Sequence, residues 1–557
     1  MAHTVPLATR LAPVEERILE FKGLNRKPYV EEGEMSAMMN LTSDRYPLLC
    51  PRKLRGSHAL PDGVSKPYSI MVKFERIAMI AQKEDENIAF FYDGEEVSKV
   101  TGLTADTEMV AINTKICFFP QQTYLSLVRS GSSVSIGEFG DLGTSISVTD
   151  ARVTIYNTTA TVVVPPGHGL SSDDAIDISG TLRYKPAGQT EFTTTDCIVS
   201  CDVRAVSATL ITLPRETFIE LTGAGATEIT LTGTVKRELP DIKHVIEWNN
   251  RLWGASDKDN TIYACKLGDP KNWKYYQGTS IDSYYAQQGT DENWTGSAAY
   301  SGHLIFFKQN SMTKIYGTSP SSFQITNTVC YGVEEGSSKS VAIVNDKVFY
   351  KSTLGIMVYE GGTPYNITEK LNVKFKNVIG GTEGIKYYAS IETVDGEHEL
   401  MVLDIDKAIW HKEDDIRFRD CCTLDGKLYF ICDEDYKTFE ADKIYVINPD
   451  EPSEALYDRV WEAELGPFDE YVEDKKIYSK MSLRLIAEAG AKVNVYIKMD
   501  NGSWETVKKF EFAGTGGETV PIVPRRCDRF SIKIKGKGNC EIKSLTRRFR
   551  RGSGVKA

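Results

Sequence analysis

Paired carboxylates are the side chains of this chain best suited to chemistry, because two acids that flank a sugar can hydrolyse its glycosidic bond. Acids of this kind are available at four positions: Glu247, Asp282, Glu399 and Asp404. Neither their spacing nor a neighbouring motif distinguishes them from the solvated acids of ordinary loops. We therefore predict no catalytic residue and expect a protein that is not an enzyme.

Motifs for nucleophilic, phosphate or dinucleotide chemistry are missing from the sequence. It contains no P-loop, no GxSxG, no HExxH and no GxGxxG. With only seven histidines, a histidine-dependent site would have to be assembled from distant segments. His168 stands in a Gly-His-Gly turn, where a structural role is favoured over a ligand role. We expect no cofactor and no cofactor-binding residue.

Metal binding has weak support. The acidic stretches 257–260 and 433–435 offer oxygen ligands for Ca²⁺, but neither has the full spacing of a calcium loop. Tight turns or exposed acids are the favoured interpretation. The 11 cysteines are an odd number, without a CxxC pair and without histidine at ligand spacing. We predict reduced thiols in the core and no metal site.

Charge is unevenly distributed along the chain. The net charge is −11, yet from Arg525 to the end twelve lysines and arginines stand against two acids. An acidic body argues against a surface that grips nucleic acid. Our hypothesis for the basic end is an arm that binds an acidic neighbouring subunit through charge complementarity. Its partner-binding residues are Arg547, Arg548, Arg550 and Arg551.

The elements that would position these residues repeat along the chain. A turn of Asn, Asp or Gly followed by Lys or Arg leads into an apolar strand, and a second strand follows within about a dozen residues. Clear copies lie at 249–254 with 262–264, 301–307 with 314–317, 345–350 with 355–359, 396–403 with 407–410, and 425–430 with 443–446; weaker ones lie at 113–119 and at 76–80 with 88–91. Units of about 40 residues with four short strands predict a β-propeller of six or seven blades.

The order of these patterns predicts a mainly β chain of several parts. We expect an N-terminal arm and strand segment over 1–65, with a short amphipathic helix at 13–21, and the first blades over 66–146. An inserted small β-barrel or sandwich over 147–237, further blades over 238–467, and a C-terminal β-sandwich with a basic tail over 468–557 follow. The sequence has no run of 18 apolar residues and no leader-like start. We therefore expect no membrane span and synthesis in the cytoplasm.

Two segments resemble a known family. The phrase WNNRLWGA at 248–255, with its continuation at 262–273, is similar to the tail-nozzle and tail-hub β-propeller proteins of tailed bacteriophages. The N-terminal segment is similar to theirs as well, in GLN at 23–25, the acidic turn at 31–34, MMNL at 38–41 and PRKLRG at 51–56. The likeness covers roughly residues 20 to 450.

This resemblance implies a structural protein of the virion tail. Such a protein forms a nozzle or hub, six copies in a ring below the portal and adaptor rings, and continues the channel for DNA ejection. The implied partners are further copies of the chain, the adaptor or head–tail connector ring, and tail fibre or tail-tip proteins. Genome DNA passes without sequence-specific binding, which suits an acidic wall that repels phosphates.

An alternative is a tail propeller that binds a receptor or carbohydrate, or hydrolyses a glycan. Aromatic side chains that could stack on sugars support it: Trp273, Tyr275, Tyr276, Tyr284 and Tyr285. The same rings more often fill the interfaces between blades. A cellular scaffold propeller without enzymatic activity is the third candidate.

Overall fold

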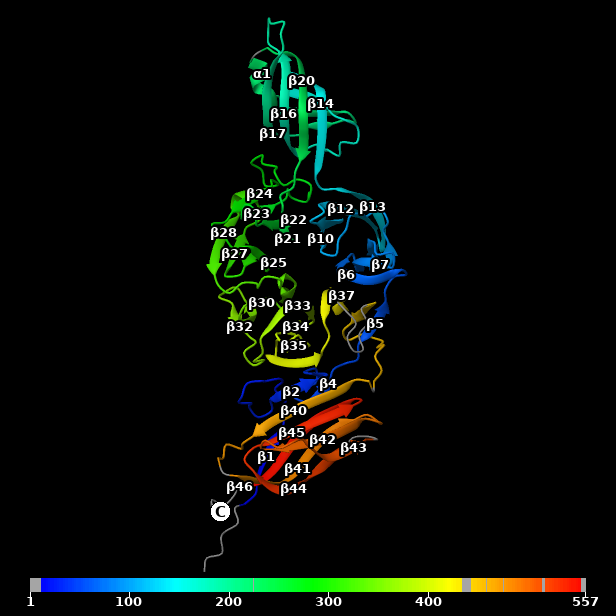
Figure 1. The fold of residues 1–557 in the computed structure, drawn as a ribbon, viewed down its shortest axis with the longest axis vertical. Coiled ribbons are helices and arrows are strands. Elements are labelled where there is room, and N and C mark those ends of the chain that lie inside the picture. The colour runs from blue at the N-terminus through cyan, green and yellow to red at the C-terminus, as the bar shows by residue number, and fades with distance from the viewer. Residues whose placement is uncertain are drawn as a thin grey trace, which may run out of the picture. The chain divides into compact units, whose positions relative to one another are not determined.

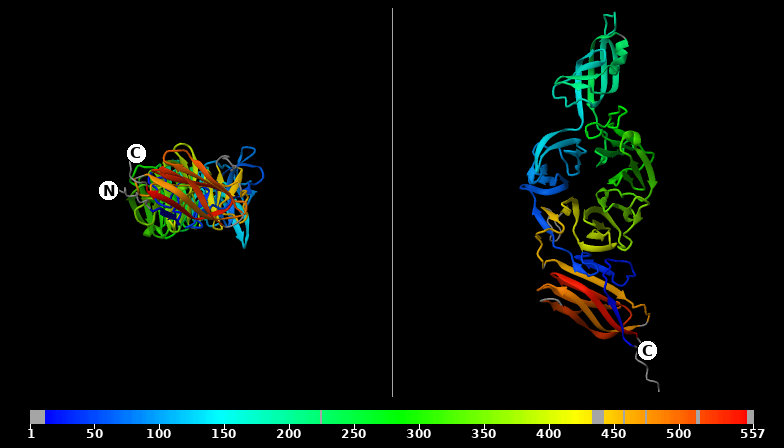
Figure 2. Two further views of the ribbon diagram at one scale, coloured as in Figure 1. Left: turned by 90° about the horizontal axis from the view of Figure 1, so that it is seen from below. Right: turned by 180° about the vertical axis from the view of Figure 1, so that it is seen from behind.

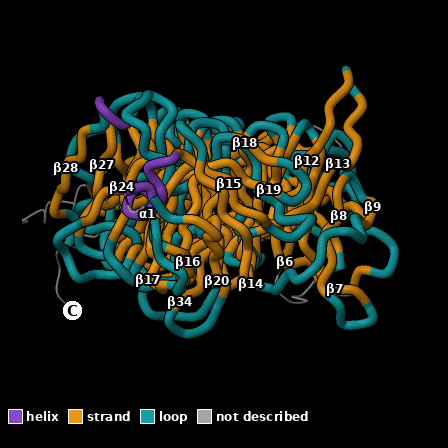
Figure 3. Tube along the Cα trace, turned by 90° about the horizontal axis from the view of Figure 1, so that it is seen from above, coloured by secondary structure: helices purple, strands orange, loops and turns teal. Residues whose placement is uncertain are grey.

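The computed structural model describes residues 12–223, 225–432, 442–456, 458–473, 475–512 and 516–551 (Figure 1). Strands make up 58% and helices 2%, and nearly all pairing is antiparallel, so the mainly β prediction is confirmed. Helical segments are short turns, purple in Figure 3: η1 (Arg215–Phe218), α1 (Ile219–Gly223), η2 (Pro320–Ser322) and η3 (Ser338–Ser340). The chain divides into two compact units, Met1–Glu75 with Lys339–Ala557, and Arg76–Ser338.

The unit Arg76–Ser338 consists of sheets whose strands pair in chain order, and one larger sheet between them. The strands are β7 (Arg76–Lys83), β8 (Ile88–Tyr92) and β9 (Glu95–Glu96); β10 (Glu108–Ile112), β11 (Lys115–Phe119), β12 (Thr123–Ser130) and β13 (Ser133–Asp141); β21 (Lys243–Trp248), β22 (Arg251–Ser256), β23 (Thr261–Ala264) and β24 (Tyr284–Gln287); β25 (Trp294–Tyr300), β26 (His303–Lys308), β27 (Ser311–Tyr316) and β28 (Gln324–Val329).

The larger sheet of this unit has seven strands. In spatial order they are β17 (Thr193–Asp202), β16 (Ala175–Lys185), β20 (Thr227–Arg237), β14 (Thr144–Ile155), β15 (Thr159–Val163), β19 (Leu210–Pro214) and β18 (Ala205–Val206). It encloses a hydrophobic cluster of its own, which runs from Ile146 to Val235. These bounds lie close to the predicted insertion at 147–237.

The repeated turns have a common backbone reason. Asn249 and Asn250, between β21 and β22, have φ values of 52° and 57°, and Asn345 and Asp346 have 48° and 57°. Two consecutive left-handed residues make the tight turn that suits the twist of a β-hairpin, and Asn and Asp tolerate this conformation best. The Asn/Asp-Lys/Arg signature of the sequence is therefore a hairpin signature.

The unit Met1–Glu75 with Lys339–Ala557 contains further sheets of the same kind and two larger ones. The first group comprises β29 (Ala342–Val344), β30 (Lys347–Ser352), β31 (Gly355–Tyr359) and β32 (Tyr365–Asn366); β33 (Phe375–Glu383), β34 (Lys386–Thr393), β35 (His398–Asp404) and β36 (Ile409–Asp414); β37 (Phe418–Leu424), β38 (Lys427–Cys432), β39 (Lys443–Val446) and β5 (Gly56–Ala59); this unit also holds β3 (Leu41–Thr42), β4 (Cys50–Pro51) and β6 (Val64–Lys73).

The two larger sheets combine both ends of the chain. One has the order β1 (Val14–Ile18), β46 (Cys540–Arg551), β41 (Lys476–Ala487), β44 (Gly516–Cys527); the other has β2 (Met35–Met39), β40 (Val460–Phe468), β45 (Phe530–Lys537), β42 (Lys492–Met499), β43 (Glu505–Glu511). Figure 2 shows the blue N-terminal strands among the orange and red C-terminal ones. Their apolar faces contribute to one core cluster.

Three sequence predictions are wrong in this unit. The helix predicted at 13–21 is strand β1, which pairs with β46. The predicted boundary at 467/468 cuts through β40, which pairs with β45 and so belongs with the C-terminal strands. The predicted N-terminal arm is not separate, because β5 adds a fourth strand to the sheet of β37, β38 and β39. The pairings of β1 with β46 and of β5 with β39 join residues about 385 to 535 positions apart, which local patterns do not reveal.

The N-terminal segment covers the outer edge of strand β36. The amide of Leu24 donates to the carbonyl of Trp410 at 2.7 Å, and that of Asn40 donates to the carbonyl of Glu413 at 2.8 Å. Gly23 has φ +84°, and a Cβ there would lie 2.4 Å from the Trp410 carbonyl oxygen. Glycine is therefore required at this approach.

Covering β36 buries charged side chains, which need partners. Arg55 donates to Glu413 at 2.6 Å and to Asp414 at 3.0 Å, and all three side chains are buried. Burial alone would raise the pKa of Glu413, but the Arg55 guanidinium outweighs burial and holds that pKa well below its usual range. A buried cation from the N-terminal segment is thus matched to two acids of β36.

Removing this cation should be costly. In Arg55→Met, Glu413 and Asp414 stay buried without their main partner, so we expect the free energy of unfolding of this unit to fall by about 3–5 kcal/mol. Urea unfolding followed by tryptophan fluorescence measures the loss. Lys53→Met, at an exposed position two residues earlier, is the control and should change it by less than about 0.5 kcal/mol. Equal effects of the two substitutions would contradict the assignment.

His244 should make the other unit sensitive to acid. Burial lowers the pKa of its imidazole to about 4, while an unfolded chain titrates near 6.5. Protonation then favours the unfolded state, so the free energy of unfolding should fall by about 3 kcal/mol as the pH drops from about 6.5 to about 4. His244→Gln keeps an N–H for the Trp294 carbonyl and should remove this part of the decline. Urea titrations across that window test it.

The exposed His58→Gln is the matched control for this pH profile. A stability difference between wild type and His244→Gln that stays constant with pH would contradict the prediction.

Candidate functional site: a pocket beside Arg547

The four predicted partner-binding arginines do not form an arm. They lie at the end of strand β46, hydrogen-bonded in the sheet between β1 and β41. Alternation along the strand turns Arg547 inward and leaves Arg548, Arg550 and Arg551 exposed. The hypothesis of a common role is therefore wrong for Arg547, because a buried side chain is unable to act as part of an exposed arm.

Arg547 is held by two acids and an aromatic ring. Its Nε donates to Glu470 at 3.0 Å, one Nη donates to Glu32 at 3.0 Å, and the guanidinium lies 3.7 Å from the centre of the Phe468 ring. Only 2% of its side chain is exposed. The second amino group, Nη1, is buried and has no hydrogen-bond partner. An unsatisfied buried donor of this kind is costly unless an acceptor from outside completes it.

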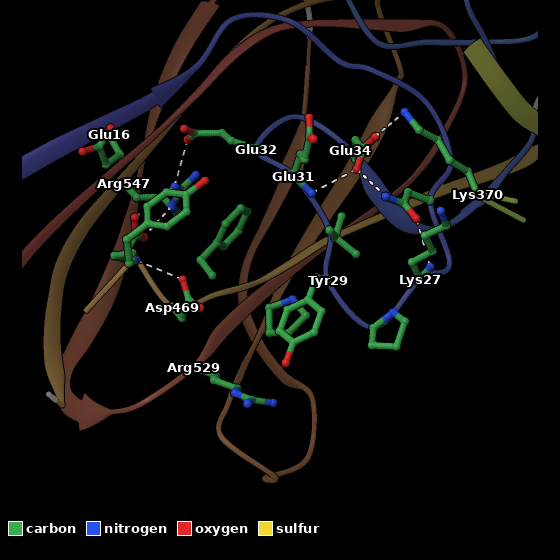
Figure 4. A pocket seen from close by; sticks show the side chains of 17 residues that line it. Glu16, Lys27, Tyr29, Glu31, Glu32, Glu34, Lys370, Asp469, Arg529 and Arg547 are labelled. Carbon is green, nitrogen blue, oxygen red and sulfur yellow. Dashed lines mark hydrogen bonds and ion pairs between the residues drawn. The ribbon is translucent and has the colours of Figure 1, made fainter. Parts of the chain in front are cut away.

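Arg547 lies on the wall of a pocket of about 480 Å³ (Figure 4). The pocket is formed within one unit by the loop that contains Tyr29 and the loop that contains Tyr471. Both tyrosines are solvent-exposed, Tyr29 at 87% and Tyr471 at 92%. The two rings stand at the edge of one hollow and offer apolar surface for a partner to cover.

A second ion pair fixes the opposite wall. Asn25 donates to Glu34 at 2.5 Å, and Lys370 donates to the other oxygen of Glu34 at 2.8 Å (Figure 4). Burial tends to raise the pKa of Glu34, but Lys370 and Asn25 together lower it below its usual value. The carboxylate is therefore ionised and occupied, and it positions the loop at 25–34.

The pocket carries an excess of negative charge. Six acids line it, at positions 16, 31, 32, 34, 469 and 470, against four bases, at positions 27, 370, 529 and 547. Arg547 and Lys370 form ion pairs with three of the acids, Glu32, Glu470 and Glu34. Among the described residues of the pocket wall, no cation pairs with Glu16 or Asp469. An acidic hollow with exposed aromatic rings can bind a cation, since ring faces attract ammonium and guanidinium groups. It contains no nucleophile–base pair.

The acids considered for catalysis have structural roles. Glu399 accepts two bonds from Arg26, both 2.8 Å, and one from Lys412 at 2.9 Å. Asp404 accepts bonds from Ser43 and Lys407, both at 2.6 Å. Carboxylates saturated in this way are poorly placed to protonate a leaving group or attack a sugar.

The other two acids belong to the unit Arg76–Ser338. Asp282 accepts the amides of Gln277 and Gly278 at 2.6 and 2.7 Å and so closes a loop. Glu247 accepts the amide of Asn250 at 2.8 Å in the hairpin turn. The structure thus brings these four acids into local contacts rather than into one catalytic pair.

The phrase WNNRLWGA, which carries the family resemblance, also has a structural explanation. Arg251 is fully buried and donates to four backbone carbonyls, those of Cys265 at 2.7 Å, Ser280 at 2.8 Å, Ile281 at 3.4 Å and Asp282 at 2.5 Å. One planar, charged group therefore ties strand β22 to the loop before β24.

The positions considered for a metal ion, and the turn with His168, make local hydrogen bonds. Both ring nitrogens of His168 contact backbone, at Ser207 and Leu170. Asp257 accepts the amide of Trp294, and Asp259 accepts the hydroxyl of Tyr263. The stretch 433–435 lies outside the described residues. Within the part of the chain that the structure describes, no cluster of three metal-ligating side chains occurs, and no helix is long and apolar enough to cross a membrane.

The predicted sugar-stacking aromatics separate into two groups. Trp273 is buried, and Tyr284 packs against Trp253 and Phe323. Tyr275 is half-buried beneath Lys266, whose Nζ lies 3.7 Å from the centre of its ring. Tyr276 and Tyr285 are exposed and touch edge to face, with ring centres 5.7 Å apart.

Sequence reasoning missed Tyr29, Tyr471 and the pocket between them. The signal was present but weak: each tyrosine stands beside a cluster of acids, at 31–34 and at 469–474. Only the pairing of the chain ends brings these two loops together.

Comparisons with known proteins give no family. No family model and no curated protein matches the chain. Among solved structures, Hsv2 of Kluyveromyces lactis matches at 13% identity and TM-score 0.26 over 46% of this chain and 71% of that one. An exo-β-1,3-galactanase of Phanerochaete chrysosporium matches at 10% identity and TM-score 0.23, over 54% of this chain and 94% of that one. A puromycin-hydrolysing peptidase of Mycobacterium tuberculosis matches at 11% identity and TM-score 0.24, over 68% of this chain and 61% of that one. Scores this low carry no argument about function.

Arg547 and Arg548 form a matched pair for a mutational test. Arg547→Met leaves Glu470 buried without its cation, so we expect the unfolding free energy to fall by about 3–5 kcal/mol. Arg548→Met changes an exposed side chain and should alter it by less than about 0.5 kcal/mol. Urea unfolding of both variants measures the difference. Similar losses, or a larger loss for Arg548→Met, would refute the inward placement of Arg547.

Proposed function

We propose that this chain is a structural protein of a bacteriophage tail, a nozzle or hub that forms a ring and continues the DNA-ejection channel below the portal and adaptor. The proposal rests on the sequence resemblance at 23–56 and 248–273. The observation that supports it best is that both segments have structural roles: Gly23 and Arg55 fasten the N-terminal segment to β36, and Arg251 ties β22 to its neighbouring loop.

The repeated sheets support the propeller architecture of that family. Four-stranded antiparallel sheets in chain order are the blades of a propeller, of which we propose six or seven. In this interpretation β5 supplies the last strand of the last blade, so the N-terminal segment closes the ring. The seven-stranded sheet is then a barrel or sandwich inserted between blades, and the two sheets of the chain ends form a sandwich.

A structural role also agrees with the hydrogen bonds of the four acids that were considered for catalysis. Glu247, Asp282, Glu399 and Asp404 are each used by a nearby hydrogen-bond donor, so we propose that the chain is not an enzyme. The net charge of −11 suits a conduit, because an acidic wall repels phosphates and lets DNA pass without sequence-specific binding. The proposed partners are the connector ring, tail fibre or tail-tip proteins, and copies of the chain itself.

The stoichiometry of purified virions tests this function. We expect quantitative mass spectrometry to find six copies per particle, and particles assembled without the chain to lack the distal tail and to eject no DNA. Absence of the chain from the particle, or loss of the chain without any effect on the tail, would refute the proposal.

A receptor- or glycan-binding tail propeller is the second candidate, and the exposed pair Tyr276 and Tyr285 favours it. Aromatic faces stack on sugar rings, so glycan-array binding that the double variant Tyr276→Ala/Tyr285→Ala abolishes would support this candidate. Hydrolysis of a bound glycan would support an enzyme and contradict the structural proposal.

A further inference from the structure

We propose that copies of this chain bind one another through two different surfaces of the same unit: the acidic tyrosine pocket of one copy receives a cationic sheet face of the next. The inference rests on the proposed function, in which the chain forms a ring, and it names the contact that would hold that ring together.

The cationic face is the exposed side of the sheet that contains β1, β46 and β41. Strand alternation places on this side the exposed residues Arg17, Lys480, Arg484, Arg548 and Arg550. Lys480 is directly opposite Arg548 across the strands, and the one acid facing Arg548 on its other side is Glu15. Like charges opposite one another destabilise a sheet. A face that retains them is suited to an anionic partner.

The pocket offers the complementary charge. Its acids exceed its bases by two, and Tyr29 and Tyr471 stand exposed at its edge. A guanidinium that enters would meet carboxylates and lie against aromatic faces, which together bind arginine well. The buried, unpartnered Nη1 of Arg547 is a second indication of a ligand, since a carbonyl of an entering backbone would satisfy it.

The two surfaces of one copy are unable to meet each other. Arg547 lines the pocket from the inner side of β46, while Arg548 and Arg550 project from the opposite side of the same strand. The cations must therefore come from a second chain. A contact between two different patches is heterologous, and repetition of such a contact closes a ring when the rotation between copies allows it.

DNA is the competing partner for a cationic face, because phosphates also bind arginine clusters. The observations favour protein, since the matching acidic surface is part of the same chain and includes exposed tyrosines and the unpartnered guanidinium Nη1 of Arg547. The charge-exchange experiment below distinguishes DNA binding from self-association.

Charge exchange tests the contact in the full-length protein. We expect sedimentation velocity at low salt to show concentration-dependent association of wild type, weakened at least about tenfold by Arg548→Glu/Arg550→Glu and likewise by Glu16→Lys/Glu31→Lys. Each variant keeps one working surface, so a mixture of the two should form a 1:1 complex that grows no further. All four changes in one chain should restore association. Lys53→Glu/Lys537→Glu, at exposed positions elsewhere in the unit, should have no effect.

Tyr29→Ala/Tyr471→Ala separates ring stacking from charge and should also weaken association, although both side chains are too exposed to affect folding. A monomeric wild type at low salt, or association that ignores both reversals, would overturn the inference even if six copies are found in virions. Duplex DNA binding that Arg548→Glu/Arg550→Glu abolishes, without self-association, would assign the face to nucleic acid instead. Absence of the chain from virions would refute the proposed function and leave the contact to be judged by the charge exchange alone.

Discussion

Strand β36 carries charged side chains in a place where water is excluded. His411, Lys412, Glu413 and Asp414 are all buried there, although an outer strand of a sheet would normally expose such residues. Burial of charge is tolerated only when each charge is matched. The N-terminal segment supplies that match for Glu413 and Asp414 through Arg55, while Lys412 pairs with Glu399 and Asp415. Main-chain bonds around Gly23 hold the segment against the strand. The buried acids of β36 therefore require the N-terminal segment to lie along this edge and to carry a cation there.

The position of the N-terminal segment along β36 also determines further strand pairs and the pocket of this unit. Once the N-terminal segment lies along β36, its next strands are placed to pair: β2 with β40 and β5 with β39. The loop that precedes β2 carries Glu32 and Glu34 to the wall of the pocket, where Glu32 accepts a hydrogen bond from Arg547 at the other end of the chain. The pocket thus exists because the two chain ends share sheets. Its loops are held by buried ion pairs at their bases and leave Tyr29 and Tyr471 exposed.

Local patterns predicted the local features well. The sequence predicted the hairpin turns with Asn249 and Asn345, the apolar strands after them and the approximate limits of the seven-stranded sheet. These features depend on backbone conformation and on neighbours in sequence. The failures concern long-range pairing. Residues 13–21 fit a helical pattern, yet β1 pairs with β46, more than 500 positions away. The same limitation misassigned Arg547, whose inward direction depends on which strands flank β46. For the site, sequence indicated the charges but gave no indication that the loops of Tyr29 and Tyr471 meet.

The proposed function requires a closed ring of sheets that shapes a passage and carries out no covalent chemistry. Electron cryomicroscopy of the tail tests this most directly, because it resolves both the sheets of one copy and the arrangement of copies. The account predicts a ring of copies around an axial opening, with β5 in the last blade of each propeller. A density map in which this chain forms a lateral spike, with no opening on the tail axis and no closed propeller, would contradict it.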